Sequence, residues 1–295
     1  MNTTAAIFLM AVAMAAHGQV KLILHGDDFG MSHSANRATI ELLETNSISS
    51  ASIMVPCPWV LEAAEYARTH PQKDIGLHLT LTSEWQKYRW GTVASRDQVK
   101  GLLDPEGYMW RSVQQVAMHA TAAEVETELR AQVEKAKALG IRFTHLDTHM
   151  GTLYARPDYF QVFEKLGKEY GVPILRLKPS PEAERAAPPA VVRYLLDNEQ
   201  RFQNEKVFRL DSLLTDPTRG TKTLDERRAA YHKAIKALKP GVHMLIIHAG
   251  FLDEEMKGIT SSAQARDWDY RTFINSQPFF KGANVQLAGW QDVTR

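Results

Sequence analysis

Short apolar runs alternate along the chain with segments in which apolar residues recur every three or four positions. The runs are mostly continuous and rich in β-branched residues, which is typical of strands buried on both faces of a sheet. They predict eight strands, at residues 20–26, 49–56, 75–82, 143–149, 173–178, 207–213, 242–250 and 285–290.

The periodic segments between these runs carry the start and stop signals of helices. Thr121 and Glu124 have the spacing of a capping box, and Gly140 stands where a helix of about five turns would end. Thr223 and Glu226 repeat the same start signal. The periodicity predicts helices within residues 34–45, 60–69, 121–140 and 223–241.

Strands that alternate with helices predict a parallel sheet. About eight strands in one domain favour an irregular, TIM-like (β/α) barrel over an open sheet, and we expect residues 19–295 to form that single domain. No G-x-G-x-x-G motif follows a strand, so the sequence does not support a dinucleotide-binding site.

Composition and charge narrow the class of protein. The chain has 295 residues, 44% of them hydrophobic, with 35 basic and 34 acidic side chains and a net charge of +1. No basic block suggests a nucleic-acid partner. The uncharged run "AAIFLMAVAMAA" near the N-terminus is too short for stable membrane insertion and predicts a signal peptide over residues 1–18, hence an exported protein.

Chemistry is concentrated at the predicted carboxyl ends of the strands, where parallel α/β folds collect their ligands. Four strands deliver histidine or aspartate to this rim: Asp27, Asp28, His78, His145, Asp147, His149 and His248. Imidazole and carboxylate ligands without thiolate suit Zn²⁺ and leave Mn, Co, Ni or Fe as alternatives. A second carboxylate beside the ion can act as a general base.

Each of these residues also has a plain structural interpretation. Asp27 can cap the turn that follows it, and a single buried His78 is commonly a hydrogen-bonded core residue. His145, Asp147 and His149 share one face of a regular strand, so either all three point inward or the strand end is irregular. The remaining histidines, His25 among them, are interpreted as structural or surface residues.

Consecutive strand residues point in opposite directions, so two adjacent aspartates cannot share one role in regular geometry. The chain must bend at "GDDFG", and Gly26 and Gly30 are residues that permit such a bend. The residues alone leave open which aspartate takes which role.

At these positions the sequence resembles the YdjC-like family, whose characterised members include chitooligosaccharide deacetylases. The segments that carry the resemblance occur in order along most of the chain: "GDDFGMSHSANRATI", "SSASIMVP", "IGLHLTLT", "THLDTHMG" and "IIHAG". Two departures from the family pattern are Gly151, at a position where the family commonly has histidine, and "HAG" in place of the commoner "HPG".

The resemblance implies an irregular TIM-like barrel that binds one divalent metal ion, Zn²⁺ before Mg²⁺ or another ion. It assigns Asp28, His78 and His149 as metal ligands and Asp27 as the general base. It implies that His248 protonates the leaving amine or stabilises the oxyanion. It also matches Arg176 to a family arginine that orients a carboxylate.

The activity that the resemblance implies is removal of an N-acetyl group from an acetylated sugar or short oligosaccharide. A metal-dependent esterase or amidase, and a sugar-binding relative without catalysis, are the alternatives. The weakly periodic segment 83–112 offers aromatic faces for sugar rings, and a packed loop is its structural alternative. These candidate substrate-binding residues are Trp85, Tyr88, Trp90 and Trp110. A homodimer is left open.

Overall fold

The computed structural model describes residues 19–181, 188–205 and 207–294. It contains one parallel sheet, with strand order β4-β3-β2-β1-β6-β5 and with β7 also paired to β1. The strands are β1 (Val20–Phe29), β2 (Ser50–Ile53), β3 (Ile75–Leu79), β4 (Leu146–Thr148), β5 (Ser212–Leu214), β6 (Gly241–Ile247) and β7 (Val285–Leu287).

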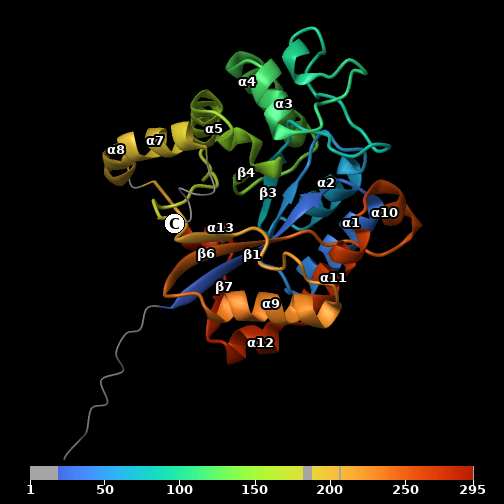
Figure 1. Cartoon of the computed structure of the whole chain (residues 1–295), viewed down its shortest axis with the longest axis vertical. Helices are drawn as coiled ribbons and strands as arrows, with labels where there is room; N and C mark the ends of the chain where they lie inside the picture. The colour runs from blue at the N-terminus through green and yellow to red at the C-terminus, as the bar shows by residue number, and fades with distance from the viewer. Residues whose placement is uncertain (1–18, 182–187, 206, 295) are drawn as a thin grey trace, which may run out of the picture.

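Single backbone bridges continue the curl of the sheet between its two ends. Ile174 forms a parallel bridge to Leu146 of β4, and Leu177 forms one to Leu210, just before β5. The predicted strand at 173–178 therefore exists only as two isolated bridges. The sheet curls into a barrel-like arrangement with helices around its outside (Figure 1). The predicted α/β class and parallel strands are confirmed.

The four predicted helices are present: α1 (His33–Glu44), α2 (Val60–Thr69), α4 (Ala122–Ala138) and α9 (Leu224–Lys236). Thr121 and Glu124 form the predicted capping box, and the Thr223 side chain accepts a hydrogen bond from the Glu226 amide. Each cap satisfies an amide that the first turn of a helix leaves unpaired.

Other short helices connect and cover the strands. They are η1 (Lys100–Leu102), α3 (Val113–His119), η2 (His149–Tyr154), α5 (Pro157–Tyr170), α7 (Pro189–Asp197), α8 (Glu199–Asn204), α10 (Glu254–Ile259), α11 (Ala263–Phe273), α12 (Gln277–Gly282) and α13 (Trp290–Val293). The segment 83–112, predicted as a long loop, contains only η1 and an isolated bridge between Leu103 and Met109. The predicted signal peptide, residues 1–18, lies outside the described residues. Within the described part of the chain, no helix has the length and apolar character needed to cross a membrane.

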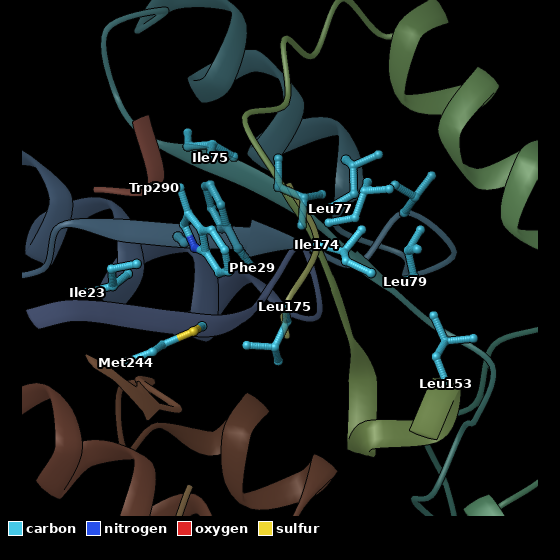
Figure 2. Close-up of a cluster of buried hydrophobic side chains, with 14 of the residues drawn as sticks. Ile23, Phe29, Ile75, Leu77, Leu79, Leu153, Ile174, Leu175, Met244 and Trp290 are labelled. Atoms are coloured by element: carbon cyan, nitrogen blue, oxygen red, sulfur yellow. The ribbon is translucent and has the colours of Figure 1, made fainter. Parts of the chain in front are cut away.

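One continuous cluster of buried hydrophobic side chains reaches in sequence from Leu22 to Trp290. Figure 2 shows part of it, in which Ile23 of β1, Leu77 of β3 and Leu175, which follows α5, belong to the same cluster as Trp290. Trp290 is fully buried and stacks on the His145 ring at a centroid distance of 4.7 Å. The C-terminal helix therefore seals the interior of the barrel-like sheet.

Trp290→Ala is expected to lower the free energy of unfolding by about 3–5 kcal/mol, because it leaves a cavity in the core. Trp59→Ala is the matched control: Trp59 is 38% exposed, so its loss removes less buried surface. Denaturant unfolding followed by circular dichroism measures both. Equal costs for the two variants would contradict the sealing role of Trp290.

Candidate metal centre

A β-bulge at the end of β1 brings both adjacent aspartates to the same interior. Gly26 pairs with Ala51 and Phe29 with Ile53, so Asp27 and Asp28 together face the one residue between those partners. Asp28 has φ +64°, a left-handed conformation that costs about 1–3 kcal/mol and is found mainly at functional sites.

The predicted bend is therefore present, but its residues need correction. Gly30 has φ +93° and contributes as predicted, whereas the second left-handed position is Asp28 itself and not Gly26. Gly26 lies in a tight space: a Cβ there would be 3.2 Å from Ile48 Cδ1, which would have to move.

Asp28, His78 and His149 converge on one point and are all buried. His149 Nδ1 lies 3.4 Å from Asp28 Oδ1 and 3.3 Å from His78 Nε2, and His78 Nε2 lies 3.7 Å from Asp28 Oδ1. With zinc–ligand bonds of about 2.0–2.2 Å, a tetrahedral ion has neighbouring ligand atoms about 3.3–3.6 Å apart. The three atoms fit one face of such a site.

Carboxylates hold the far side of both histidine rings. His78 Nδ1 lies 2.6 Å from Asp147 Oδ1, and His149 Nε2 lies 3.1 Å from Glu84 Oε2. In each ring the N–H donates to the carboxylate, which leaves the other nitrogen to present a lone pair to an ion. This arrangement is the one that metal-binding histidines generally have.

The charge of the cluster also suits a cation. Burial would lower the pKa of both histidines, but the Asp27 and Asp147 charges raise that of His78 to about 8. The Glu84 and Asp28 charges likewise raise the pKa of His149 to about 10. The surrounding carboxylates thus favour positive charge at this point, which a divalent ion supplies.

Arg266 fixes the orientation of Asp28. Its Nη2 donates to Asp28 Oδ2 at 2.6 Å, and both side chains are buried. Burial opposes ionisation, but the guanidinium charge and the His149 contact hold the pKa of Asp28 well below its usual range. Asp28 Oδ1 has no hydrogen-bond partner, so it is the oxygen free to bind an ion.

Asp27 stands beside these groups in a different environment. Its Oδ2 lies 3.7 Å from His78 Nε2 and 3.8 Å from His248 Nε2, and its Oδ1 lies 3.3 Å from His25 Nε2. Burial raises the pKa of Asp27 to about 6, against the lowering effect of His78. A carboxylate with this pKa can accept a proton near neutral pH. The two adjacent aspartates therefore differ in electrostatics as well as in position.

A buried polar network lies beneath the centre. His25 Nε2 is 2.9 Å from Asp147 Oδ2, so Asp147 bridges His25 and His78. His145 lies deeper, with its Nδ1 3.4 Å from Asp74. A Cβ on Gly76 would lie 2.4 Å from His145 Nε2, so only glycine makes room for this ring. Asp147 and His149 contact the centre and His145 the network below it, so all three face the interior.

A cavity of about 690 Å³ opens above the centre. Its lining includes all five residues to which the family resemblance assigns metal binding or proton transfer. These are Asp27, Asp28, His78, His149 and His248. His248 follows β6 and its side chain is 41% exposed, whereas Asp27 is almost fully buried. A substrate in the cavity therefore has access to His248 from its open side.

Arg176 is not among the residues that line this cavity. Its Nη2 donates to Glu164 at 2.6 Å, and its guanidinium lies 4.5 Å from the centre of the Phe202 ring. The carboxylate that Arg176 contacts is Glu164 of α5, and its predicted role in catalysis stays a prediction.

None of the four candidate aromatic residues is among those that line this cavity, and their contact with a substrate stays a prediction. Trp90 is 3% exposed and its ring packs against those of Trp85 and Tyr88. Trp110 stacks on His119, and its indole donates to the Gly101 carbonyl. They form a packed loop, since each ring buries more area against its neighbours than it exposes.

Three residues of the centre were not predicted as part of it. His25 was interpreted as structural or surface, although the strand period of two places it on the same face as Asp27 and could have identified it. Glu84 follows β3 by five residues, so only its nearness to a strand end marks it. Arg266 comes from α11, far from any motif, and no signal in the sequence indicates its contact.

Asp147→Asn is expected to weaken metal binding about 10–100-fold, because the amide cannot replace a carboxylate that orients the His78 ring. Competition with a chromophoric chelator measures the affinity. Asp104→Asn is the control, since Asp104 pairs with Arg89 in the aromatic loop. An unchanged affinity in Asp147→Asn would exclude the proposed orientation of His78.

Similarity to known proteins extends over most of this chain. The model of the family described as YdjC-like protein matches residues 21–279. A carbohydrate deacetylase of Thermus thermophilus is 30% identical over 254 residues, covering 86% of this chain and 84% of the relative. One of Clostridium beijerinckii is 26% identical, covering 93% and 100%. One of Brevibacillus brevis is 36% identical, but the match spans only 58% of that relative and 52% of this chain.

Among solved structures, a protein of Enterococcus faecalis V583 named for the cleavage of cellobiose phosphate has the same fold. Its TM-score is 0.75 at 22% sequence identity, and the superposition covers 92% of this chain and 98% of that one. The likeness at this identity supports the fold alone.

Proposed function

Since the chain belongs to the YdjC-like family, we propose that it is a metal-dependent carbohydrate deacetylase, a hydrolase that removes the N-acetyl group of a sugar. The observation that carries the proposal is the triangle of Asp28 Oδ1, His78 Nε2 and His149 Nδ1 at the base of the cavity. The names of the Thermus and Clostridium relatives supply the substrate class.

Asp28, His78 and His149 would hold one divalent ion, and two nitrogens with one oxygen and no thiolate favour Zn²⁺ over Mg²⁺. Such an ion acidifies a water molecule and polarises an amide carbonyl. Asp147 and Glu84 keep the two imidazoles in the tautomers that bind it, and Arg266 keeps Asp28 Oδ1 free.

Asp27 would act as the general base. Its carboxylate takes a proton from the attacking water, whose oxygen forms a bond to the acetamide carbon. His25 and His248 flank the carboxylate on opposite oxygens, at 3.3 and 3.8 Å. The distance of 3.3 Å to His25 Nε2 supports a role for His25 in positioning this base.

His248 would complete the reaction. It lies 3.8 Å from Asp27 Oδ2 on the open side of the cavity, where it can donate a proton to the amine nitrogen. The amide C–N bond then breaks, acetate leaves, and the sugar keeps a free amine. One water is consumed, and the proton that Asp27 takes balances the one that His248 gives.

Acetate release from N-acetylglucosamine and its short oligomers tests the proposal. Protein loaded with Zn²⁺ is expected to release acetate, and a chelator is expected to stop the release until Zn²⁺ is restored. Release from O-acetyl sugars alone would favour the esterase alternative. No release across N- and O-acetyl sugars would overturn the deacetylase proposal.

A further inference from the structure

The cavity extends well beyond the reaction centre, and its outer part has no role in the chemistry described above. We propose that this outer part binds an apolar aglycone, so that the substrate is an N-acetylated sugar joined to an alkyl chain rather than to a second sugar. The inference rests on the proposed deacetylase function and specifies its substrate class.

The outer wall of the cavity is apolar and comes from segments distant in sequence. It is formed by Leu177, Val192, Leu195, Leu196, Phe202 and Leu213. Val192, Leu195 and Leu196 follow the three- and four-residue spacing of one helical stripe on α7. Leu196 is 47% exposed, so this stripe presents apolar surface at the cavity.

The charged side chains in this part of the cavity are held in ion pairs. Lys178 Nζ lies 2.6 Å from Asp211 Oδ1, and Arg209 forms an ion pair with Glu199. A second sugar ring brings several hydroxyl groups, and burying them without hydrogen-bond partners is unfavourable. An alkyl chain makes no such demand, so this wall suits it better.

The flat aromatic faces on which sugar rings usually pack are not available either. Among the described residues that line the cavity, the aromatic rings are those of Tyr154 and Phe202. Phe202 is 2% exposed, and the guanidinium groups of Arg176 and Arg201 lie over its ring at 4.5 and 4.7 Å. The Tyr154 hydroxyl donates to the Leu175 carbonyl. Phe202 is therefore not a free platform for a second sugar, and the Tyr154 ring packs against that of Phe160 at a centroid distance of 5.3 Å.

The inner and outer parts form one continuous cavity, so the group bound in the outer part belongs to the same molecule as the acetylated sugar. Polar groups (Asp27, His149, His248 and Arg266) line the end that holds the acetylated sugar, and the apolar stripe of α7 lines the other end. A single molecule with a polar head and an apolar tail matches this order. The tail is the group on the sugar that leads away from the acetamide.

Acetate release from three substrates tests the inference with Zn²⁺-loaded full-length protein: methyl and octyl N-acetyl-β-glucosaminide, the latter below its micelle concentration, and di-N-acetylchitobiose. We expect kcat/KM for the octyl glycoside to exceed that for the methyl glycoside at least tenfold, mainly through KM. Equal values for the two glycosides, or a preference for chitobiose over both, would overturn the inference.

Two variants locate the effect. Leu195→Gln and the near-isosteric Val192→Thr are each expected to reduce the octyl-to-methyl ratio at least threefold. Leu61→Gln is the matched control, because Leu61 is 65% exposed on α2 and does not line the cavity. A ratio that stays unchanged in both α7 variants would contradict the assignment of this wall.

Calorimetric binding to Asp27→Asn protein separates this inference from the proposed reaction. A dissociation constant at least tenfold lower for the octyl glycoside, without acetate release by the wild-type protein, would support the apolar site and remove the deacetylase proposal. Acetate release by the wild-type protein, together with equal binding of both glycosides, would support the deacetylase proposal and overturn the apolar site.

Discussion

Asp27→Asn is expected to lower kcat for acetate release about 10²–10⁴-fold while leaving the metal content at one ion per chain. The amide is close in shape to the carboxylate but cannot accept the proton of water. Asp27 is not one of the three ligands in the Asp28, His78 and His149 group, although its Oδ2 lies 3.7 Å from His78 Nε2, so removing its charge leaves the three ligand atoms in place. Steady-state kinetics and elemental analysis of the same preparation give both values.

Loss of the metal in Asp27→Asn would point to a different role for Asp27. If Asp27→Asn strips the metal, then Asp27 is a ligand and the division of roles between the two aspartates is wrong. Asp253→Asn is a suitable control: Asp253 caps α10 by accepting from the Met256 amide, and it does not line the cavity.

His149→Ala is expected to abolish both metal binding and acetate release. It removes one of the three ligand atoms and also leaves Glu84 without its imidazole partner. Chelator competition is expected to show an affinity too weak to retain the ion through dialysis, and activity is expected to fall to the level of metal-free protein.

His119→Ala is the matched histidine control. His119 stacks on Trp110 in the loop region and does not line the cavity. It is expected to keep full metal content and activity. A His149→Ala protein that retains the ion and its activity would refute the centre as described.

The helices and most strands could be predicted from the sequence wherever apolar patterning and capping or turn residues indicate the same element. Apolar runs and capping boxes located the strands and α1, α2, α4 and α9, because burial on both faces and helix caps leave clear patterns. The run at 173–178 reads as a strand but makes only the bridges at Ile174 and Leu177. Strand pairing depends on partners distant in sequence, which the run itself does not encode.

The same limit applies to the centre. The positions of Asp27, Asp28, His78 and His248 at predicted strand ends indicated that they lie in the centre, because every parallel strand brings its carboxyl end to one edge. Arg266 reaches Asp28 from a helix 238 residues later, a contact that only tertiary packing creates.

In the aromatic loop, composition leaves two interpretations open. Tryptophan and tyrosine serve sugar binding and core packing equally well, and their sequence is the same in both cases. In the structure Trp90 is packed between Trp85 and Tyr88, and Tyr88 donates to the Met31 carbonyl.

The proposed sugar deacetylase activity requires one metal ion at Asp28, His78 and His149. Acetate release from an N-acetyl-β-glucosaminide, measured while Zn²⁺ is titrated into metal-free protein, tests it most directly. We predict that activity rises linearly and reaches its plateau at one equivalent per chain. Acetate release that does not depend on Zn²⁺, or none at any metal content, would contradict the claim.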